Sequence, residues 1–484
     1  MSDAAHGATR RTDRMQDSGV RRAGGLGRLK GRVVRARRLI KNGEEELRTG
    51  IGAIARTIGL ERQARANGLF EPRGFEMRSY PCDVGGVRAQ VVTPAGEACM
   101  HTFFDVQPLS ASGRYLAVTR LPFEHRGPYP GDMAEICVID LTGQTIETVY
   151  RTGGWALQLG ANIQWHPTDD RFLFCNDLGA GRGVGVMIDR EDRTSCSYAA
   201  PFYAIEPTGQ GMLGPALDLV NRTQYGYGVP ETVTGRRSLR PGAARDEGIW
   251  RTDLGTGRVE LLASIHDLVQ ASPDRDLLMT GTNILFHTKI HEDGGRIFQV
   301  LRSMDLVDRP GAVRSRIMTL DADGSGIREL LPHRDWDRGG HHPSWMSGAR
   351  RVLMNLVPER GGEMRFVILD DDGSGCRQVL DDWRGSGHPS IEARGRYLVT
   401  DAYLNEGFGE PDGKAPLRLI DLRDGIEHHI MQLDCGPPNL RARRIDPHPV
   451  WGRDGRSVIV NGVVDGRRAV MIADLSEFFG AQRK

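Results

Sequence analysis

Four histidines occupy the same place in four similar segments. The segments read HTKIHEDGGRIFQVL (287–301), HHPSWMSGARRVLMNL (341–356), HPSIEARGRYLVTDAY (388–403) and HPVWGRDGRSVIVNG (448–462). In each, a histidine precedes a Gly-containing turn and an apolar strand, and the four are His287, His342, His388 and His448. Three or four imidazole nitrogens can hold Zn, Mn, Fe or Ni. The pattern predicts one divalent metal ion, Mn or Zn, with Asp446 orienting His448. The alternative is a turn-packing histidine that recurs only because the segment recurs.

A second polar set lies earlier in the chain. It comprises His101, His125, Arg126, Trp155, Asn162, His166, Arg182, Tyr225 and Tyr227. Such residues suit proton removal next to a carboxylate. A positive group neutralises the carboxylate, a His or Tyr takes the proton, and a second one protonates the leaving oxygen. The alternative is a group of ordinary polar residues at strand ends.

The elements that must position these residues come from an internal repeat. Weaker copies of the histidine segment read FFDVQPLSASGRYLAV, NIQWHPTDDRFLF and FYAIEPTGQGML, which brings the copies to seven. A second repeat, a strand ending in Asp followed by a turn and another strand, alternates with the first. Its aspartates are Asp140, Asp189, Asp253, Asp321, Asp370, Asp421 and Asp474.

Two hairpins in each unit give four strands, and seven such units predict an all-β, seven-bladed β-propeller. Equivalent positions of neighbouring blades converge near the axis, so the four histidines are expected to meet there. We predict two parts, an N-terminal extension over residues 1–76 and the propeller over residues 77–484. The stretch 77–94 is expected to supply the strand that closes the ring.

The N-terminal extension is basic. Up to Gly74 it holds 17 Lys and Arg against 8 Asp and Glu, a net charge of 17 − 8 = +9. Residues 28–66 have a partly helical pattern of apolar residues. One interpretation is a tether to a partner or an anionic surface, and the other is a solvated, partly disordered arm.

Composition excludes several classes of protein. The net charge of +1 argues against a chain-wide nucleic-acid-binding surface, and no nucleic-acid partner is expected. The sequence contains no run of 18 apolar residues, so no transmembrane segment is predicted. The N-terminus also has no apolar signal core, so no secretory signal is expected. The seven cysteines are scattered without a CxxC pair, which favours a reducing, cytoplasmic compartment.

Several stretches resemble the propeller-type polysaccharide lyases, namely the oligogalacturonate lyases and the ulvan-lyase-like families. They are HTFFDVQPLSASGRYLAVTR, QLGANIQWHP, the GYG near residue 226, GHPS at 387–390 and DPHPVWGRDGRSVIV. The resemblance covers roughly residues 95–475. It implies β-elimination at a uronic-acid residue of an oligosaccharide, with a divalent metal held by histidines near the axis.

The resemblance also implies roles for individual residues. His101, His125 and Tyr225 match the catalytic groups. Arg182 matches the carboxylate-binding arginine, and the other substrate-binding residues are His166, Tyr227 and Arg126. The sequence departs from the family where a catalytic Tyr of the second unit is expected, near His166, and where a metal-binding Cys is expected, at Ser344. Two other functions stay open: a non-catalytic propeller that binds a glycan or protein, and hydrolysis by a metal-bound water.

Overall fold

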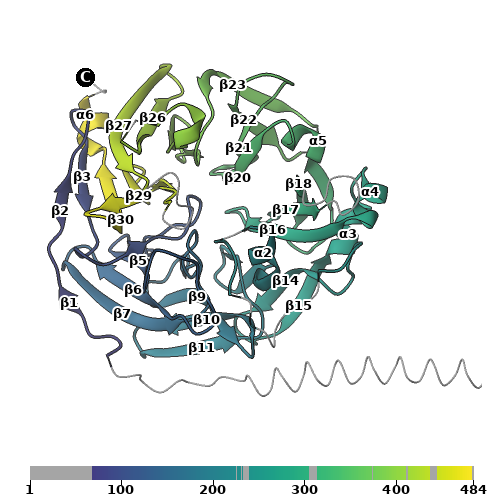
Figure 1. The fold of residues 1–484 in the computed structure, drawn as a ribbon, viewed down its shortest axis with the longest axis horizontal. Helices are drawn as coiled ribbons and strands as arrows, with labels where there is room; N and C mark the ends of the chain where they lie inside the picture. The colour runs from purple at the N-terminus through teal and green to yellow at the C-terminus, as the bar shows by residue number, and fades with distance from the viewer. Residues whose placement is uncertain are drawn as a thin grey trace, which may run out of the picture. The chain divides into compact units, whose positions relative to one another are not determined.

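Seven antiparallel sheets form a ring, as the repeats predict (Figure 1). The computed structural model describes residues 68–224, 226–230, 232, 239–304, 313–372, 374–409, 412–436 and 444–481. Residues 1–67, which make up most of the predicted N-terminal extension, lie outside the described chain. The seven-bladed β-propeller is therefore confirmed for the described residues.

Each blade runs from an inner strand at the axis to an outer strand at the rim. Blade 1 contains β4 (Cys99–Met100), β5 (Tyr115–Arg120), β6 (Ala134–Asp140) and β7 (Thr145–Thr152). Blade 2 contains β8 (Gln164–Trp165), β9 (Phe172–Gly179), β10 (Arg182–Asp189) and β11 (Thr194–Tyr198). Blade 3 contains β12 (Ala204–Ile205), β13 (Gly211–Gly214), β14 (Gly248–Asp253) and β15 (Val259–Ser264). Blade 1 has a further edge strand, β1 (Arg73–Gly74), which pairs with β7.

The remaining blades follow the same order. Blade 4 contains β16 (Thr282–Ile290), β17 (Arg296–Met304), β18 (Val313–Asp321) and β19 (Arg328–Leu331). Blade 5 contains β20 (Gly340–Met346), β21 (Ala349–Leu356), β22 (Arg365–Asp370) and β23 (Arg377–Arg384). Blade 6 contains β24 (Ser390–Ile391), β25 (Tyr397–Thr400), β26 (Lys414–Asp421) and β27 (Ile426–Asp434).

Both ends of the chain build blade 7. The C-terminal strands β28 (Val450–Trp451), β29 (Ser457–Val464) and β30 (Arg467–Asp474) continue into β3 (Arg88–Val91) and β2 (Arg78–Tyr80). Ala89 and Val91 of β3 are buried in the core between blades, while Arg88 and Gln90 are exposed. The prediction that residues 77–94 supply the closing strand is confirmed.

Short helices lie between the strands. They are α2 (Leu217–Thr223), α3 (Ile265–Gln270), α4 (Arg275–Thr280), α5 (His333–Trp336), the 3₁₀ turn η1 (Leu404–Glu406) and α6 (Ser476–Ala481). Among the described residues, no helix has the length and apolar character needed to cross a bilayer.

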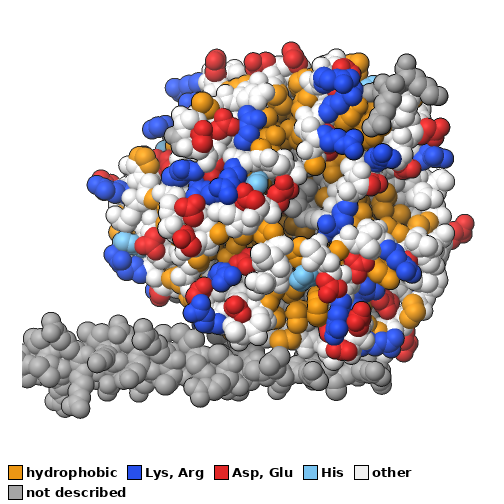
Figure 2. Space-filling view, turned by 180° about the vertical axis from the view of Figure 1, so that it is seen from behind, with side chains coloured by type: hydrophobic (Ala, Val, Ile, Leu, Met, Phe, Trp, Pro, Cys, Tyr) orange, Lys and Arg blue, Asp and Glu red, His pale blue; other side chains and the backbone are white. Residues whose placement is uncertain are grey.

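An ion pair explains why the two repeats alternate. In five blades the Arg near the first turn bonds the Asp that ends the third strand, and Asp140, Asp189 and Asp421 also accept backbone amides of the next turn. The pairs are Arg114–Asp140 (2.5 Å), Arg171–Asp189 (2.7 Å), Arg296–Asp321 (2.7 Å), Arg351–Asp370 (2.6 Å) and Arg396–Asp421 (2.6 Å). Figure 2 shows Lys and Arg side chains interspersed with Asp and Glu side chains over one face of the molecule.

Polar side chains also fasten each blade to its neighbour. Three inner-strand tryptophans donate their indole N–H to a carbonyl of an adjacent blade: Trp165 to Pro108, Trp345 to Lys289 and Trp451 to Ser390. Three second-strand asparagines donate to a backbone carbonyl of the next blade, and one of these carbonyls, that of Gly387, precedes a predicted metal histidine: Asn176 to Phe202, Asn355 to Gly387 and Asn461 to His101. We call these three the asparagine clamps.

Candidate functional site

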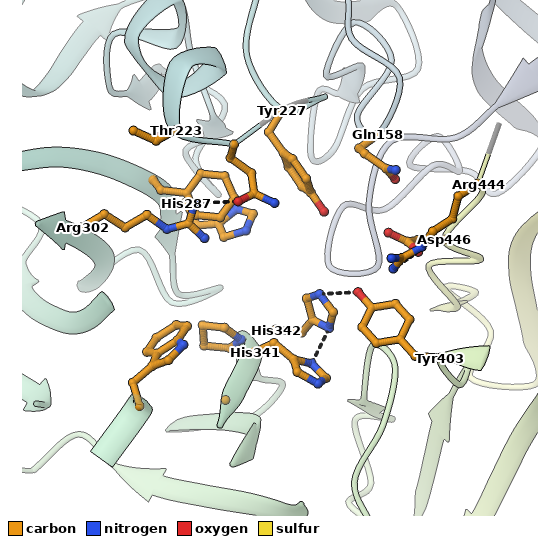
Figure 3. Close-up of a pocket in the computed structure, with 15 residues that line it drawn as sticks. Gln158, Thr223, Tyr227, His287, Arg302, His341, His342, Tyr403, Arg444 and Asp446 are labelled. Carbon is orange, nitrogen blue, oxygen red and sulfur yellow. Dashed lines mark hydrogen bonds and ion pairs between the residues drawn. The ribbon is translucent and has the colours of Figure 1, made fainter. Parts of the chain in front are cut away.

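A cavity of about 530 Å³ lies at the mouth of the ring where the inner strands begin. Its walls come from blades 4 to 7, from the connection between β7 and β8, from the end of α2 and the residues after it, and from α5. Figure 3 shows Arg302 and Arg444 on opposite sides of it, with His341, His342 and Tyr403 along a third side. A volume of this size is typical of a small-molecule binding site.

Backbone irregularities aim the predicted metal histidines at the axis. His287 and His342 each fall at a break in strand register, where the bulged strand turns its side chain inward. His287, His342 and His448 adopt left-handed φ values of 57°, 54° and 51°, while Gly387 supplies the same conformation before His388. Strained backbone of this kind persists where the surrounding structure holds it, which is common at functional sites.

Three of the four predicted metal histidines are in contact, with His388 between His342 and His448. The His342 and His388 rings stack at 3.7 Å between centroids, and the His388 and His448 rings meet edge to face at 4.4 Å. His287 stands across Phe103, whose ring lies 5.2 Å from His287 and 4.6 Å from His448. Phe103 and its neighbour Phe104 thus fill the axis between the histidines.

His388 and His448 have the ring nitrogens that are best placed to bind a metal ion. His388 holds Asp401 on Nδ1 at 3.0 Å, and its Nε2 has no partner. Neither ring nitrogen of His448 has a partner, and burial lowers its pKa well below the usual range, so the ring is neutral. One ligand atom each of His388, His448 and Asp446 lies within 4.8 Å of the others. Unpartnered buried imidazole nitrogens, one of them on a histidine that a carboxylate orients, are a donor set that a divalent ion such as Zn²⁺ or Mn²⁺ can use.

His342 is engaged on both nitrogens. Its Nδ1 lies 2.6 Å from the carbonyl of Gly387, which only accepts, so Nδ1 carries the proton. Burial lowers the pKa of His342 well below its usual range, and the neutral ring therefore has an unprotonated Nε2. This nitrogen lies 3.0 Å from the Tyr403 hydroxyl, which donates to it (Figure 3). His287 is similarly hydrogen-bonded through Nδ1 to the Tyr203 hydroxyl.

Arg302, at the end of β17, contributes a positive charge without an acidic partner among the described residues. Its Nη1 donates to Gln224 Oε1 at 2.8 Å, its buried Nε has no partner, and its guanidinium lies 3.8 Å above the Phe286 ring. Burial lowers its pKa to about 10, so it stays charged at neutral pH. Arg444 differs, because it bonds Asp446 at 2.6 Å and lies over Tyr403. Arg302 is therefore the free cationic group of this cavity.

The predicted catalytic and substrate-binding residues are spread more widely. Tyr227 lines the cavity. His101 is buried beside the axis with both ring nitrogens unpartnered, outside the cavity lining. His125 is exposed, and Arg126 bonds Asp132 at 2.6 Å on the same loop. Tyr225 lies outside the described residues.

Two further predicted substrate-binding residues lie away from the cavity. Arg182 is exposed at the start of β10. His166 follows β8 and packs against Gly209, next to residues of the opposite mouth of the ring. The structure thus brings together Tyr227 and the axial histidines, while His125, His166 and Arg182 are not among the residues that line the cavity.

Arg302, Tyr403, Asp401 and Glu406 line or support the cavity without having been singled out from the sequence. Arg302 ends an ordinary alternating strand, and nothing in QVLRSM distinguishes it. Asp401 and Tyr403 had a weak signal, since both follow the second strand of a blade whose inner strand carries a metal histidine. Glu406 bonds His341 at 3.2 Å, a contact that depends on the η1 turn.

A second cavity, of about 640 Å³, occupies the opposite mouth. Most of its charged and amide side chains already have partners within the ring: Gln107 donates to Trp451 O, Gln164 donates to Tyr203 O, and Lys289 pairs with Asp105. Few polar groups there are free to recognise a ligand. The mouth that carries the histidines is therefore the candidate site.

No family model and no curated protein matches this chain. Among solved structures, it is similar to an oligogalacturonate lyase in complex with manganese, at 16% identity and a TM-score of 0.60, over 85% of this chain and 99% of that one. It is also similar to an oligogalacturonate lyase from Vibrio parahaemolyticus, at 14% identity and a TM-score of 0.58, over 86% of this chain and 100% of that one. At these identities the likeness is one of fold, and the chain shares the propeller architecture of these two lyases.

Proposed function

We propose that this protein is a lyase that cleaves uronate-containing oligosaccharides by β-elimination. The observation that carries the proposal is Arg302, a cavity arginine with no acidic partner among the described residues. A buried cation without a counter-ion favours an anionic ligand, and a planar guanidinium matches a carboxylate. The two solved lyases of the same fold support oligogalacturonates as the first substrates to test.

The residues around the cavity fit the parts of this reaction. Arg302 binds the uronate carboxylate, which makes the proton on C5 more acidic. Tyr403 faces the cavity with its hydroxyl proton directed at His342 Nε2, so this pair can take up a proton and return one. As C5 loses its proton, its electrons form the C4–C5 double bond, the C4–O bond breaks, and the leaving oxygen is protonated.

His388 Nε2, His448 and Asp446 are the groups that would hold a divalent ion, Mn²⁺ or Zn²⁺. Such an ion supplies positive charge that stabilises the carbanion as it forms beside the carboxylate. His287 and His342 stay predicted ligands, although each has one or both ring nitrogens hydrogen-bonded in this structure. A cytoplasmic location, with short imported or self-made oligomers as substrates, also stays a prediction.

The direct test is ultraviolet absorbance of the unsaturated uronate product with a panel of oligogalacturonates and added Mn²⁺. Arg302→Met should lower kcat/KM by about 100-fold or more, since it removes the charge that stabilises the carbanion. The matched control is Arg350→Met, an exposed arginine whose partner is Asp293. Binding without any product would favour the glycan-binding scaffold. New reducing ends without the double bond would favour hydrolysis.

A further inference from the structure

Trp336 places a large aromatic side chain on the wall of the candidate cavity. It lines the cavity together with Arg302 and Phe286, and it is partly buried against the core of blades 4 and 5. The inner-strand tryptophans of the opposite mouth use their indole N–H groups to join blades. No hydrogen bond occupies the indole N–H of Trp336 among the described residues, so its position serves no such structural link.

The segment around Trp336 is held firmly. Asp335, which is buried, accepts hydrogen bonds from Arg377 and from Arg338 at 2.9 Å. The amide of Trp336 donates to Pro332 O at 3.3 Å, and its carbonyl accepts from Gly339 at 3.0 Å. The chain then enters β20, which carries His341 and His342. The backbone that carries the indole is therefore held in place relative to β20 before any ligand arrives, and such preorganisation lowers the entropy lost on binding.

A pyranose ring has an apolar face of C–H groups and a polar rim, and a uronate adds a carboxylate at that rim. An indole offers an extended apolar face at little cost in conformational entropy. We propose that Trp336 is the stacking platform for the pyranose ring whose carboxylate Arg302 binds. This inference rests on the proposed function, and it specifies a cyclic sugar acid, in place of an open-chain carboxylate, as the ligand.

Trp336→Ala should raise the KM for trigalacturonate about tenfold or more, while kcat changes less than about threefold, because stacking contributes to ground-state and transition-state binding alike. Trp336→Phe keeps an aromatic face and should stay within about threefold of the native KM. An unchanged KM in Trp336→Ala, or a fall in kcat with KM unchanged, would overturn the platform.

A second measurement does not need turnover or the alanine variant. Galacturonic acid, which has no glycosidic bond to cleave, should change the tryptophan fluorescence of the native protein. Trp336→Phe should abolish this change, while Trp250→Phe, a control on β14, should retain it. A change that persists in Trp336→Phe overturns the inference.

The failure of the proposed reaction and the failure of the platform are distinguishable. If the native protein binds galacturonic acid but forms no unsaturated product from trigalacturonate, the proposed reaction fails, and the fluorescence of the two Phe variants still decides whether Trp336 is the platform. If the native protein cleaves trigalacturonate and Trp336→Ala behaves like it, only the platform fails.

Discussion

Asp401 shows how a single carboxylate orients the ring of a candidate metal ligand, His388. It is fully buried, bonds His388 Nδ1 with both oxygens at 3.0 Å, and accepts the His388 backbone amide at 2.6 Å. These contacts direct the unpartnered Nε2 toward His448 and Asp446, and they make this nitrogen more basic and hence a better ligand for a metal ion. The four axial histidines were predictable from their repeated position. Asp401 had only the weak signal of its place after the second strand of such a blade, because one acidic residue after a strand has no special pattern.

Asp401→Asn should weaken Mn²⁺ or Zn²⁺ binding about 10- to 100-fold, since the amide no longer makes the imidazole more basic. Titration calorimetry with each metal measures this. Asp421→Asn is the matched control in the same blade, where the carboxylate pairs with Arg396 at an outer turn. Equal affinity in native and Asp401→Asn protein would show that His388 is not a ligand.

His101 is expected to make the free energy of unfolding depend on pH. Burial lowers its pKa from 6.5 to about 3, so the unfolded chain binds a proton at mildly acidic pH that the folded chain does not. The stability that neutral His101 contributes is complete above pH 6.5 and is lost as pH falls toward 3, by up to about 1.4 kcal/mol per pH unit. With a chelator present, His101→Gln should make the free energy of unfolding fall less steeply between pH 6 and 4. Urea denaturation at several pH values measures the slope, and identical slopes would contradict the assignment.

At the scale of the element, the asparagine clamps connect blade packing to the site. Asn355 holds the Gly387 carbonyl at 2.8 Å, and the same carbonyl accepts from His342 Nδ1. The hairpins and turns of each blade were predictable from the alternating repeats, because apolar periodicity and turn residues are local. The clamps and the bulges at His287 and His342 join strands of neighbouring blades or break register, and no local pattern specifies them.

Asn355→Ala should destabilise the protein by about 1–3 kcal/mol, because the buried Gly387 carbonyl loses a donor. It should also weaken metal binding, since Gly387 precedes His388. Asn176→Ala removes the equivalent clamp to Phe202 in a blade without a metal histidine. It should show a similar loss of stability with metal affinity intact. If Asn355→Ala and Asn176→Ala bind the metal equally well, the asparagine clamp at Gly387 does not contribute to the metal site.

At the scale of the whole molecule, the ring depends on a strand from each end of the chain. Val91 of β3 pairs with Met471 of β30 and is buried. The number of blades and the closing segment were predictable because repeats can be counted. The composition of the cavity was not, because it joins side chains from blades 4 to 7 that are separated by long stretches of sequence.

Val91→Asp should open the ring, because an unpaired carboxylate would be buried between two blades. We expect a lower melting temperature and faster cleavage by trypsin. Gln90→Asp places the same charge one residue earlier on the exposed side of β3 and should behave like the native protein. A ring that tolerates Val91→Asp would show that β3 contributes little to closure.

The closing strand also has a consequence for how the protein is made. Val91 and its partner Met471 are 471 − 91 = 380 residues apart. At about 5–20 residues per second, a ribosome needs about 20–80 s to add the residues that separate them. During that interval β2 can already pair with one edge of β3, but the edge that pairs with β30 has no partner. An open strand edge with an apolar side is prone to pair with other chains, so synthesis of this ring includes a long period of exposure to aggregation.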